Sequence, residues 1–343
     1  MTRIARRRVL AVLALVLAGA LDAAAAPAEL AGYGADARKT TVSGLSSGAF
    51  MAVQLQVAYS ASIAGAGVVA GGPYYCAIGN EYFTRICMGQ MPVVPPNASV
   101  MVGYAKAFAA AGTIDPLANL KARRILVFSG SNDSIVKPPA VAATVEFFRR
   151  VGVADANLRY VSDVPAGHAL IAPAFGNDCA ANAAPYISHC SVDGKAYDHA
   201  GAILEHLYGA LQPRVAAPGG RIVAFAQRSF AAASTGMAET GYLYVPSACT
   251  AAGARCRVHV ALHGCLQSFQ SVQDSFIAHA GYNAWADGNR LLVLYPQVDK
   301  SSSPDNEYGC WDWWGYTGGH YAHKSAPQMK AIMAMVKRLA KEP

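Results

Sequence analysis

The chain has 343 residues, of which 53% are hydrophobic and 14% are charged. This composition excludes a disordered chain, and no collagen-like, heptad or longer repeat is visible. Part of the formal net charge of +7 comes from a basic N-terminal segment, and the other Lys and Arg residues are dispersed. The sequence therefore predicts one large folded domain and no nucleic acid as a partner.

Residues 1–26 have the pattern of a secretory signal peptide. Basic residues come first, an apolar run extends from Val9 to Leu21, and small residues follow from Ala23 to Ala26. The run is short for a membrane span, which needs about 20 residues, and an uncleaved anchor is the alternative. We expect residues 27–343 to form a secreted domain, extracellular or periplasmic, without stable membrane insertion.

The first half of the chain alternates predicted strands and helices. A strand over Arg38–Leu45 runs through a glycine-rich turn into a helical pattern over Ala49–Gln56. Such alternation predicts an α/β fold, with a mostly parallel sheet and helices on both faces. The further strands are predicted at Ile63–Ala70, Arg124–Phe128 and Leu158–Val161, and the further helices at Val141–Val151 and Ala200–Leu211.

The second half begins near Pro213 and continues the same pattern. Two of its strands, VHVAL and LLVLY, are continuously apolar, as expected for strands buried on both faces. Both halves are therefore expected to share one sheet. The predicted strands are Arg221–Ala226, Thr240–Val245, Arg257–Leu262 and Arg290–Tyr295, and the predicted helices are Ser271–Ala286 and Ala326–Leu339.

Eight cysteines in an exported chain suggest four disulfides, although many pairings are formally possible. A zinc site is the alternative, but no Cys-x2-Cys pair or His-Glu-x-x-His helix occurs, so no metal is expected. Closeness in the sequence favours three short loops and leaves one bond between distant segments: Cys76–Cys87, Cys179–Cys190, Cys249–Cys256 and Cys265–Cys310.

Gly44-Leu45-Ser46-Ser47-Gly48 stands at the junction of a predicted strand and a predicted helix. This is the pattern of a nucleophile elbow, in which the serine projects above the sheet from a strained turn. A helix-capping serine is the structural alternative. We predict Ser46 as the nucleophile, with Ser47 as the second choice.

A serine hydroxyl needs an imidazole base and a carboxylate that orients it. Asp133 and His168 each follow a predicted strand, in the chain order that α/β-hydrolases use. We predict Asp133 as the acid and His168 as the base, and Asp163 is the rival acid. The competing histidines are interpreted as surface, helix-face or loop residues: His189, His199, His206 and His279.

The strand Val258–Leu262 ends in His263-Gly264-Cys265, the form of an oxyanion-hole turn. In an ordinary α/β-hydrolase this turn precedes the nucleophile, whereas here it follows all three triad candidates. The chain therefore resembles a circularly permuted α/β-hydrolase. The amides of Ser47 and Cys265 are the expected oxyanion donors, and His263 is interpreted as structural.

Three of the four tryptophans lie within Trp311–Trp314. The predicted Cys265–Cys310 bond would bring this cluster near the oxyanion turn. Large aromatic side chains usually pack in the core, and we expect two of the three to do so. The third, Trp311, is predicted to face an ester substrate.

Long strings of the chain resemble the single-domain poly(3-hydroxybutyrate) depolymerases, which have a circularly permuted α/β-hydrolase fold. The resemblance implies one catalytic domain, a monomer without a cofactor, and a polyester or oligoester substrate. It also implies the same roles for Ser46, Asp133, His168, the Ser47 and Cys265 amides, and Trp311. The strings are SGLSSGAFMAVQLQVAYS, AGGPYYC, SGSNDSIV, TGYLYVPSAC, HVALHGCLQS and GCWDWWGYTG.

Two departures concern the surroundings of the site. Ala49-Phe50 stands where the family often has Gly-Tyr, and an apolar stretch follows His168. Two alternatives also stay open, because a triad does not identify the ester that it cleaves and because the tryptophan cluster could serve binding alone. One is an esterase for feruloyl or acetyl groups of plant polysaccharide, or for aromatic polyesters. The other is a surface-binding protein without catalysis.

Overall fold

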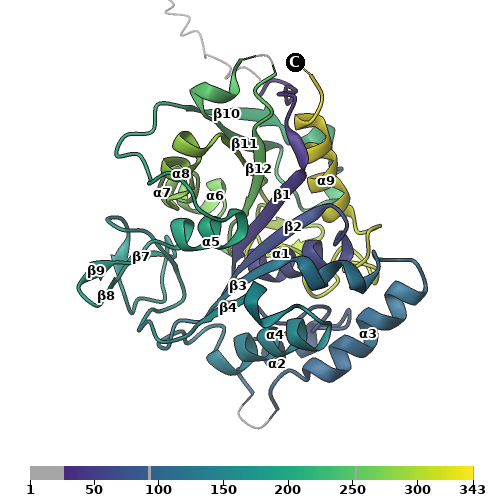
Figure 1. The fold of residues 1–343 in the computed structure, drawn as a ribbon. Coiled ribbons are helices and arrows are strands. Elements are labelled where there is room, and N and C mark those ends of the chain that lie inside the picture. The colour runs from purple at the N-terminus through teal and green to yellow at the C-terminus, as the bar shows by residue number, and fades with distance from the viewer. Residues whose placement is uncertain (1–26, 92–93, 252, 343) are drawn as a thin grey trace, which may run out of the picture.

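One mixed sheet of eight strands organises the chain in the computed structural model, which describes residues 27–342 except 92, 93 and 252 (Figure 1). The predicted signal peptide over residues 1–26 lies outside the described residues. The strand order across the sheet is β10 (Arg221–Ala226), β11 (Thr240–Val245), β13 (Leu291–Tyr295), β12 (Arg257–Leu262), β1 (Asp36–Leu45), β2 (Ile63–Val69), β3 (Arg124–Phe128) and β4 (Leu158–Val161).

β1 is a central strand that pairs in parallel with both β12 and β2. Val42 of β1 lies opposite Val260 on one side and Ala66 on the other. The pairs β2–β3, β3–β4 and β12–β13 are also parallel, and only β11 pairs antiparallel with its neighbours β10 and β13. The prediction of one mostly parallel sheet that joins both halves of the chain is confirmed.

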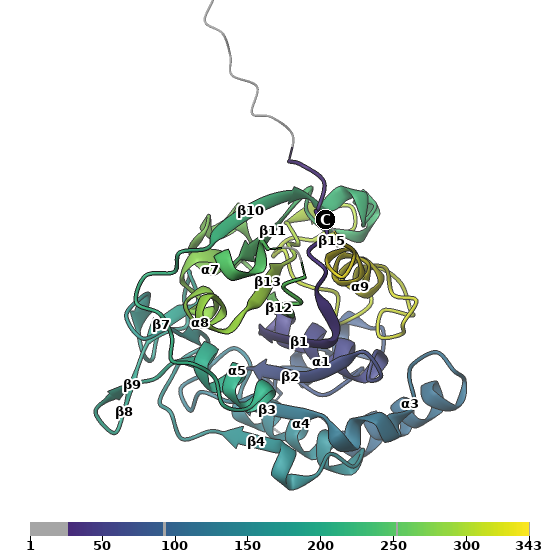
Figure 2. The ribbon, with the colours of Figure 1, turned by 45° about the horizontal axis from the view of Figure 1, so that its top comes forward.

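Helices cover both faces of this sheet (Figure 2). α1 and α9 lie on one face, and α5, α7 and α8 lie on the other. The α-helices of the described residues are α1 (Ser47–Ala58), α2 (Thr84–Cys87), α3 (Ala98–Ala110), α4 (Pro138–Arg150), α5 (His199–Tyr208), α6 (Phe269–Val272), α7 (Ser275–His279), α8 (Tyr282–Asn289) and α9 (Pro327–Leu339).

The single helix predicted over Ser271–Ala286 is wrong, because the segment forms parts of α6, α7 and α8. The backbone leaves the helical region at Gln273, with φ 54°, and at Gly281, with φ 92°. A left-handed residue cannot continue a right-handed helix, so the chain turns at both positions.

Residues 162–198 form an insertion between β4 and α5, outside the main sheet. The insertion contains a three-stranded sheet and a hairpin, neither of which the sequence predicted. Their strands are β5 (Leu170–Ile171), β6 (Asn177–Asp178) and β7 (Ile187–His189), then β8 (Ser191–Val192) and β9 (Lys195–Ala196); a further short pair, β14 (Ser301–Ser302) and β15 (Asp305–Asn306), lies near the C-terminal helix in sequence.

All eight cysteines form disulfides, so none is available as a metal ligand. The four bonds are those that sequence closeness favoured: Cys76–Cys87, Cys179–Cys190, Cys249–Cys256 and Cys265–Cys310.

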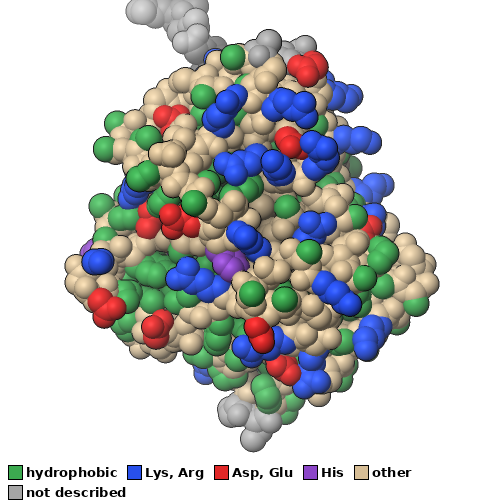
Figure 3. Space-filling view, viewed as in Figure 1, with side chains coloured by type: hydrophobic (Ala, Val, Ile, Leu, Met, Phe, Trp, Pro, Cys, Tyr) green, Lys and Arg blue, Asp and Glu red, His purple; other side chains and the backbone are tan. Residues whose placement is uncertain are grey.

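Lys and Arg side chains are spread over the face shown in Figure 3, with Asp and Glu among them. Within the described residues, no helix combines the length and the hydropathy that a membrane crossing needs.

Candidate active site

Ser46 occupies a strained turn between β1 and α1. Its backbone has φ 56° and ψ −123°, a conformation that residues other than glycine rarely adopt. The flanking glycines permit the turn: a Cβ on Gly44 would lie 2.3 Å from the carbonyl carbon of Gly48, and a Cβ on Gly48 would lie 2.4 Å from the carbonyl oxygens of Leu262 and His263. The elbow geometry predicted for this pentapeptide is therefore present.

The two adjacent serines differ in exposure. Ser46 is 9% exposed, whereas Ser47 is 1% exposed and its Oγ is buried without a hydrogen-bond partner among the described residues. The Ser46 side chain does not cap α1, so the capping alternative is not supported. Because no side chain caps this helix, the Ser47 amide at its N-terminus is available to a ligand.

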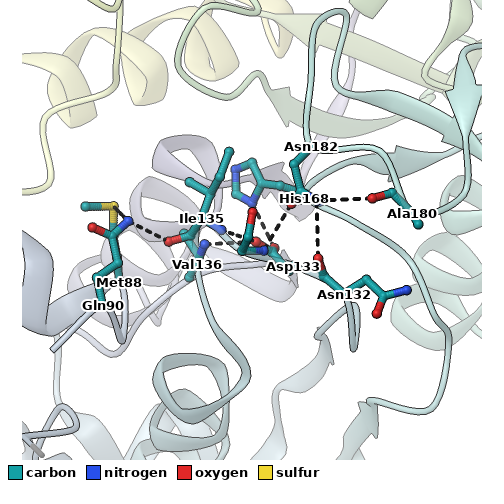
Figure 4. A network of polar contacts seen from close by, with 10 residues as sticks. Met88, Gln90, Asn132, Asp133, Ile135, Val136, His168, Ala180 and Asn182 are labelled. Atoms are coloured by element: carbon teal, nitrogen blue, oxygen red, sulfur yellow. Dashed lines mark hydrogen bonds and ion pairs between the residues drawn. The ribbon is translucent and has the colours of Figure 1, made fainter. Parts of the chain in front are cut away.

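Asp133 and His168 form a buried hydrogen-bonded pair, with 2.8 Å between Asp133 Oδ2 and His168 Nδ1 (Figure 4). The other carboxylate oxygen, Oδ1, accepts hydrogen bonds of 2.9 Å from the amides of Ile135 and Val136. These amides hold the carboxylate in one orientation. Its second oxygen is thus directed at the imidazole, as an acid that orients a base requires.

The two residues meet because β3 and β4 are parallel neighbours that end at the same edge of the sheet. The loops that follow them touch through backbone hydrogen bonds, including Asn132 N to Ala166 O at 3.0 Å. Gly130 is required here, since a Cβ would lie 2.2 Å from the Ala166 carbonyl oxygen. Asp163, the rival acid, is exposed and is not hydrogen-bonded to His168.

Asn182 also belongs to the site, although no pattern in the sequence predicts it. Its Oδ1 accepts from His168 N at 2.9 Å and from Ser134 N at 3.0 Å. Its Nδ2 donates to the carbonyls of Asn132 and Ala180 (Figure 4). An asparagine in a disulfide-closed loop carries no sequence signal for this role, because all but one of its partners belong to other loops.

The His263–Cys265 turn lies against the elbow, as predicted. A Cβ on Gly264 would lie 3.4 Å from the Cβ of Ser46, and Cys265 is bonded to Cys310. Among the described residues the Cys265 amide donates no hydrogen bond. Two free amides, those of Ser47 and Cys265, therefore flank the elbow from different segments.

Gln267 connects this turn to the histidine side of the site. Its Oε1 accepts from the Gly264 amide at 2.7 Å, and its Nε2 donates to the carbonyls of Pro185 and Tyr186 at 3.0 Å. The Tyr186 ring is 6.1 Å from the His168 ring, edge on. No hydrogen bond joins Ser46 to His168 in the described part of the chain; such bonds are often long until substrate binds.

His263 has a structural environment, in line with its interpretation from the sequence. Its Nδ1 donates to the Gly264 carbonyl at 2.7 Å and its Nε2 accepts from the Val298 amide at 3.0 Å. Burial lowers the pKa of His263 to about 4, so the ring is neutral at pH 7. Both ring nitrogens are used to hold the turn.

Trp311 is predicted from the sequence to face an ester substrate, but the structure buries it, with 0% exposed. The ring packs 5.5 Å from the ring of His263 inside the core. Trp313 is buried as well and stacks on Phe50 at 4.2 Å. Trp314 is the half-buried member of the cluster and lines a surface cavity of about 470 Å³ with Tyr308 and Tyr316.

A second histidine, His259, also contacts a serine, but in the interior of the fold. Its Nε2 is 2.8 Å from Ser43 Oγ, and its Nδ1 is 2.7 Å from Thr41 Oγ1. All three side chains are fully buried, and both ring nitrogens are occupied. Because substrate cannot reach Ser43, this pair is structural.

The remaining histidines form no catalytic pair. The prediction that His199 is a surface or helix-face residue is wrong, because the ring is fully buried and accepts from the Ile171 amide at 2.8 Å. His206 is half-buried at a backbone carbonyl, His189 is exposed, and His279 stacks on Phe175 at 3.9 Å.

The chain is similar to two proteins named as polyhydroxybutyrate depolymerases. The chain is 46% identical over 310 residues to the poly(3-hydroxybutyrate) depolymerase of Delftia acidovorans; the match covers 89% of the chain and only 60% of that relative. It is 38% identical over 341 residues to the polyhydroxybutyrate depolymerase of Talaromyces funiculosus, with 95% and 96% covered. No protein-family model matches the chain.

Solved structures show the same similarity. The crystal structure of the PHB depolymerase from Penicillium funiculosum superposes with a TM-score of 0.83 at 37% identity, over 91% of this chain and 98% of that one. A PHB depolymerase complexed with an R3HB trimer matches with the same values.

Proposed function

The chain belongs to the family of poly(3-hydroxybutyrate) depolymerases, and from this premise we propose that it is a serine esterase that hydrolyses poly(3-hydroxybutyrate) or its oligomers. The observation that carries the proposal is the buried Asp133–His168 pair, which follows parallel strands of the sheet that also carries the strained turn at Ser46. The relative that was solved with an R3HB trimer supports the substrate class.

Ser46 is the proposed nucleophile and His168 the proposed base. Ser46 Oγ attacks the ester carbonyl carbon while its proton passes to His168 Nε2. The alcohol end of the substrate then leaves with that proton, and the acyl group stays on Ser46. Water attacks the acyl carbon, again through His168, and releases the carboxylic acid.

Asp133 and the two amides stabilise the charges that form during the reaction. Asp133 accepts from His168 Nδ1 and so directs Nε2 toward the nucleophile, and it stabilises the imidazolium that forms. The amides of Ser47 and Cys265 donate to the oxyanion. Loss of one such donor costs about 10²–10³ in kcat in other enzymes. The reaction requires no cofactor.

We also propose that the fold is a circularly permuted α/β-hydrolase. The support is the sheet order, in which the four later strands β10, β11, β13 and β12 form one side of the sheet and join β1 through β12. The segment before β1 and the end of α9 are hydrogen-bonded, with Tyr33 N to Leu339 O at 3.0 Å. Termini that lie close together permit such a rearrangement.

Residues 27–343 are proposed to be one catalytic domain that acts as a monomer outside the cytoplasm. Four disulfides support export to an oxidising compartment. Trp314, rather than the buried Trp311, is proposed as the tryptophan that contacts substrate.

Product analysis on a suspension of amorphous poly(3-hydroxybutyrate) tests the proposal. The protein should clear the suspension and release hydroxybutyrate monomers or oligomers, and Ser46→Ala should not. Parallel assays for ferulate and acetate release, and for soluble products from an aromatic polyester, test the alternative esterases. Binding to the polymer without turnover, and without labelling of Ser46 by an organophosphate, would identify a surface-binding protein.

A further inference from the structure

We propose that the loop between Cys179 and Cys190 is a positioning element for both halves of the active site, and that Asn182 and Gln267 are the positioning residues through which it acts. The inference rests on the proposed function of Ser46, Asp133 and His168. Neither Asn182 nor Gln267 touches the reacting atoms, so both would act through other residues.

Asn182 fixes the backbone around Asp133 relative to the backbone at His168. Its Oδ1 binds the amide of His168 and the amide of Ser134, the residue after Asp133, and its Nδ2 binds the carbonyl of Asn132, the residue before it. One side chain thus fixes the backbone on both sides of the acid and at the base. The Asp133–His168 distance depends on the relation between these two loops.

The loop is close to the base in its backbone as well. The Gly167 amide donates to the Cys179 carbonyl at 2.8 Å, and a Cβ on Gly167 would lie 2.2 Å from the Ala181 carbonyl oxygen. Such close packing leaves one position for the residue before His168. The Cys179–Cys190 disulfide closes the loop that supplies these contacts.

Gln267 binds the other end of the same loop to the oxyanion turn. Its amide group links the Gly264 amide to the carbonyls of Pro185 and Tyr186, and its side chain is fully buried. A free amide at Cys265, the next residue, is one of the two proposed oxyanion donors. The Cys179–Cys190 loop is therefore common to the acid–base pair and to the oxyanion turn.

Steady-state kinetics on a soluble p-nitrophenyl butyrate ester, with organophosphate titration of active sites, test the positioning role. Asn182→Ala and Gln267→Ala should each lower kcat per titrated site about 10- to 100-fold, because a shift of about 1 Å costs this much. KM should change less than about threefold. Asn182→Asp keeps an acceptor oxygen for the two amides. Its kcat should lie between those of Asn182→Ala and the parent protein.

Matched controls separate positioning from loop folding. Asn177→Ala removes two amide bonds inside the same region, to the carbonyls of Ala183 and Ala184, and Gln270→Ala removes a bond to the Lys300 amide. Both should keep parental kcat. An Asn177→Ala loss equal to that of Asn182→Ala, or parental kcat in Asn182→Ala or Gln267→Ala, overturns the proposal.

The double variant Asn182→Ala with Gln267→Ala tests whether one loop serves both halves. A shared loop predicts that the combined loss differs from the product of the single losses by more than about threefold. Losses that multiply would show two separate supports and overturn the shared role. Failure of the parent protein to hydrolyse the ester would instead contradict the proposed function. If an alanine variant does not fold, Asn182→Asp and Gln267→Glu provide the same comparison.

Discussion

His168 and His259 each hold hydroxyl or carboxyl partners at hydrogen-bonding distance, but in different regions of the fold. His168 follows the carboxyl end of β4 and uses only Nδ1, which binds Asp133. His259 lies within β12, where Thr41 and Ser43 occupy both nitrogens and burial lowers its pKa to about 3. Contact with a serine is thus insufficient for catalysis; a free nitrogen, a carboxylate partner and access to substrate are also needed.

The serines of the two regions should differ most in their effect on activity. Ser46→Ala is expected to lower kcat by about 10⁶-fold, because loss of the nucleophile removes the acyl-enzyme route. Ser43→Ala is expected to keep kcat within about tenfold while losing about 1–3 kcal/mol of unfolding free energy. Ester hydrolysis and urea unfolding measure the two effects. An inactive Ser43→Ala variant together with an active Ser46→Ala variant would contradict the assignment of Ser46 as the nucleophile.

The carboxylate partner gives the next largest contrast. Asp133→Asn should lower kcat about 10⁴-fold, since an amide can donate to Nδ1 and stabilise the wrong tautomer. Asp163→Asn, at the exposed rival acid, should leave kcat unchanged. Rates at saturating ester concentration, with active sites counted by organophosphate, provide the measurement. Similar kcat in the two variants would contradict the pairing seen in the structure.

The buried His259 should affect the unfolding free energy rather than the rate of ester hydrolysis. Because its folded-state pKa is about 3, His259 binds a proton only in the unfolded chain between pH 6.5 and 3. Its contribution is complete above pH 6.5 and is lost as the pH falls, at about 1.4 kcal/mol per pH unit. His199 and His263 act in the same direction.

His259→Gln should therefore make the dependence of the unfolding free energy on pH shallower by about 1.4 kcal/mol per unit below pH 6.5. Urea unfolding at pH 7, 6 and 5 measures this slope. His189→Gln, at an exposed position, is the control and should keep the parental slope. An unchanged slope in His259→Gln would show that the ring is not buried in the neutral form.

The smallest effect on activity is expected at Trp314. Trp314→Ala should lower hydrolysis of the polymer a fewfold and leave hydrolysis of a small soluble ester unchanged, because only an extended substrate would reach the surface cavity. Trp311→Ala should instead lower stability by about 3–5 kcal/mol through the cavity that it creates. If Trp314→Ala lowered the hydrolysis of polymer and of small ester equally, Trp314 would not be a contact specific to the polymer.

The amino-acid sequence by itself determined the features that depend on neighbours in the chain. The local sequence pattern predicted all eight strands of the sheet. The inner strands β12 and β13 are continuously apolar because they are buried on both faces. Short spacing predicted three disulfides and left the fourth, and the glycines around Ser46 predicted its turn. The Asp133–His168 pair was predicted from the strand end that precedes each residue, which is a local signal, together with the order of the triad candidates along the chain.

Only the tertiary structure decided the contacts between distant loops. Asn182 reaches back 50 residues to Asn132, and Gln267 reaches back 81 residues to Tyr186. No local pattern identifies these hydrogen-bond partners. The same holds for the break at Gln273, where a residue other than glycine has a positive φ, and for the burial of Trp311. Local sequence specifies local backbone and hydrophobicity, whereas long-range packing chooses which side chains meet.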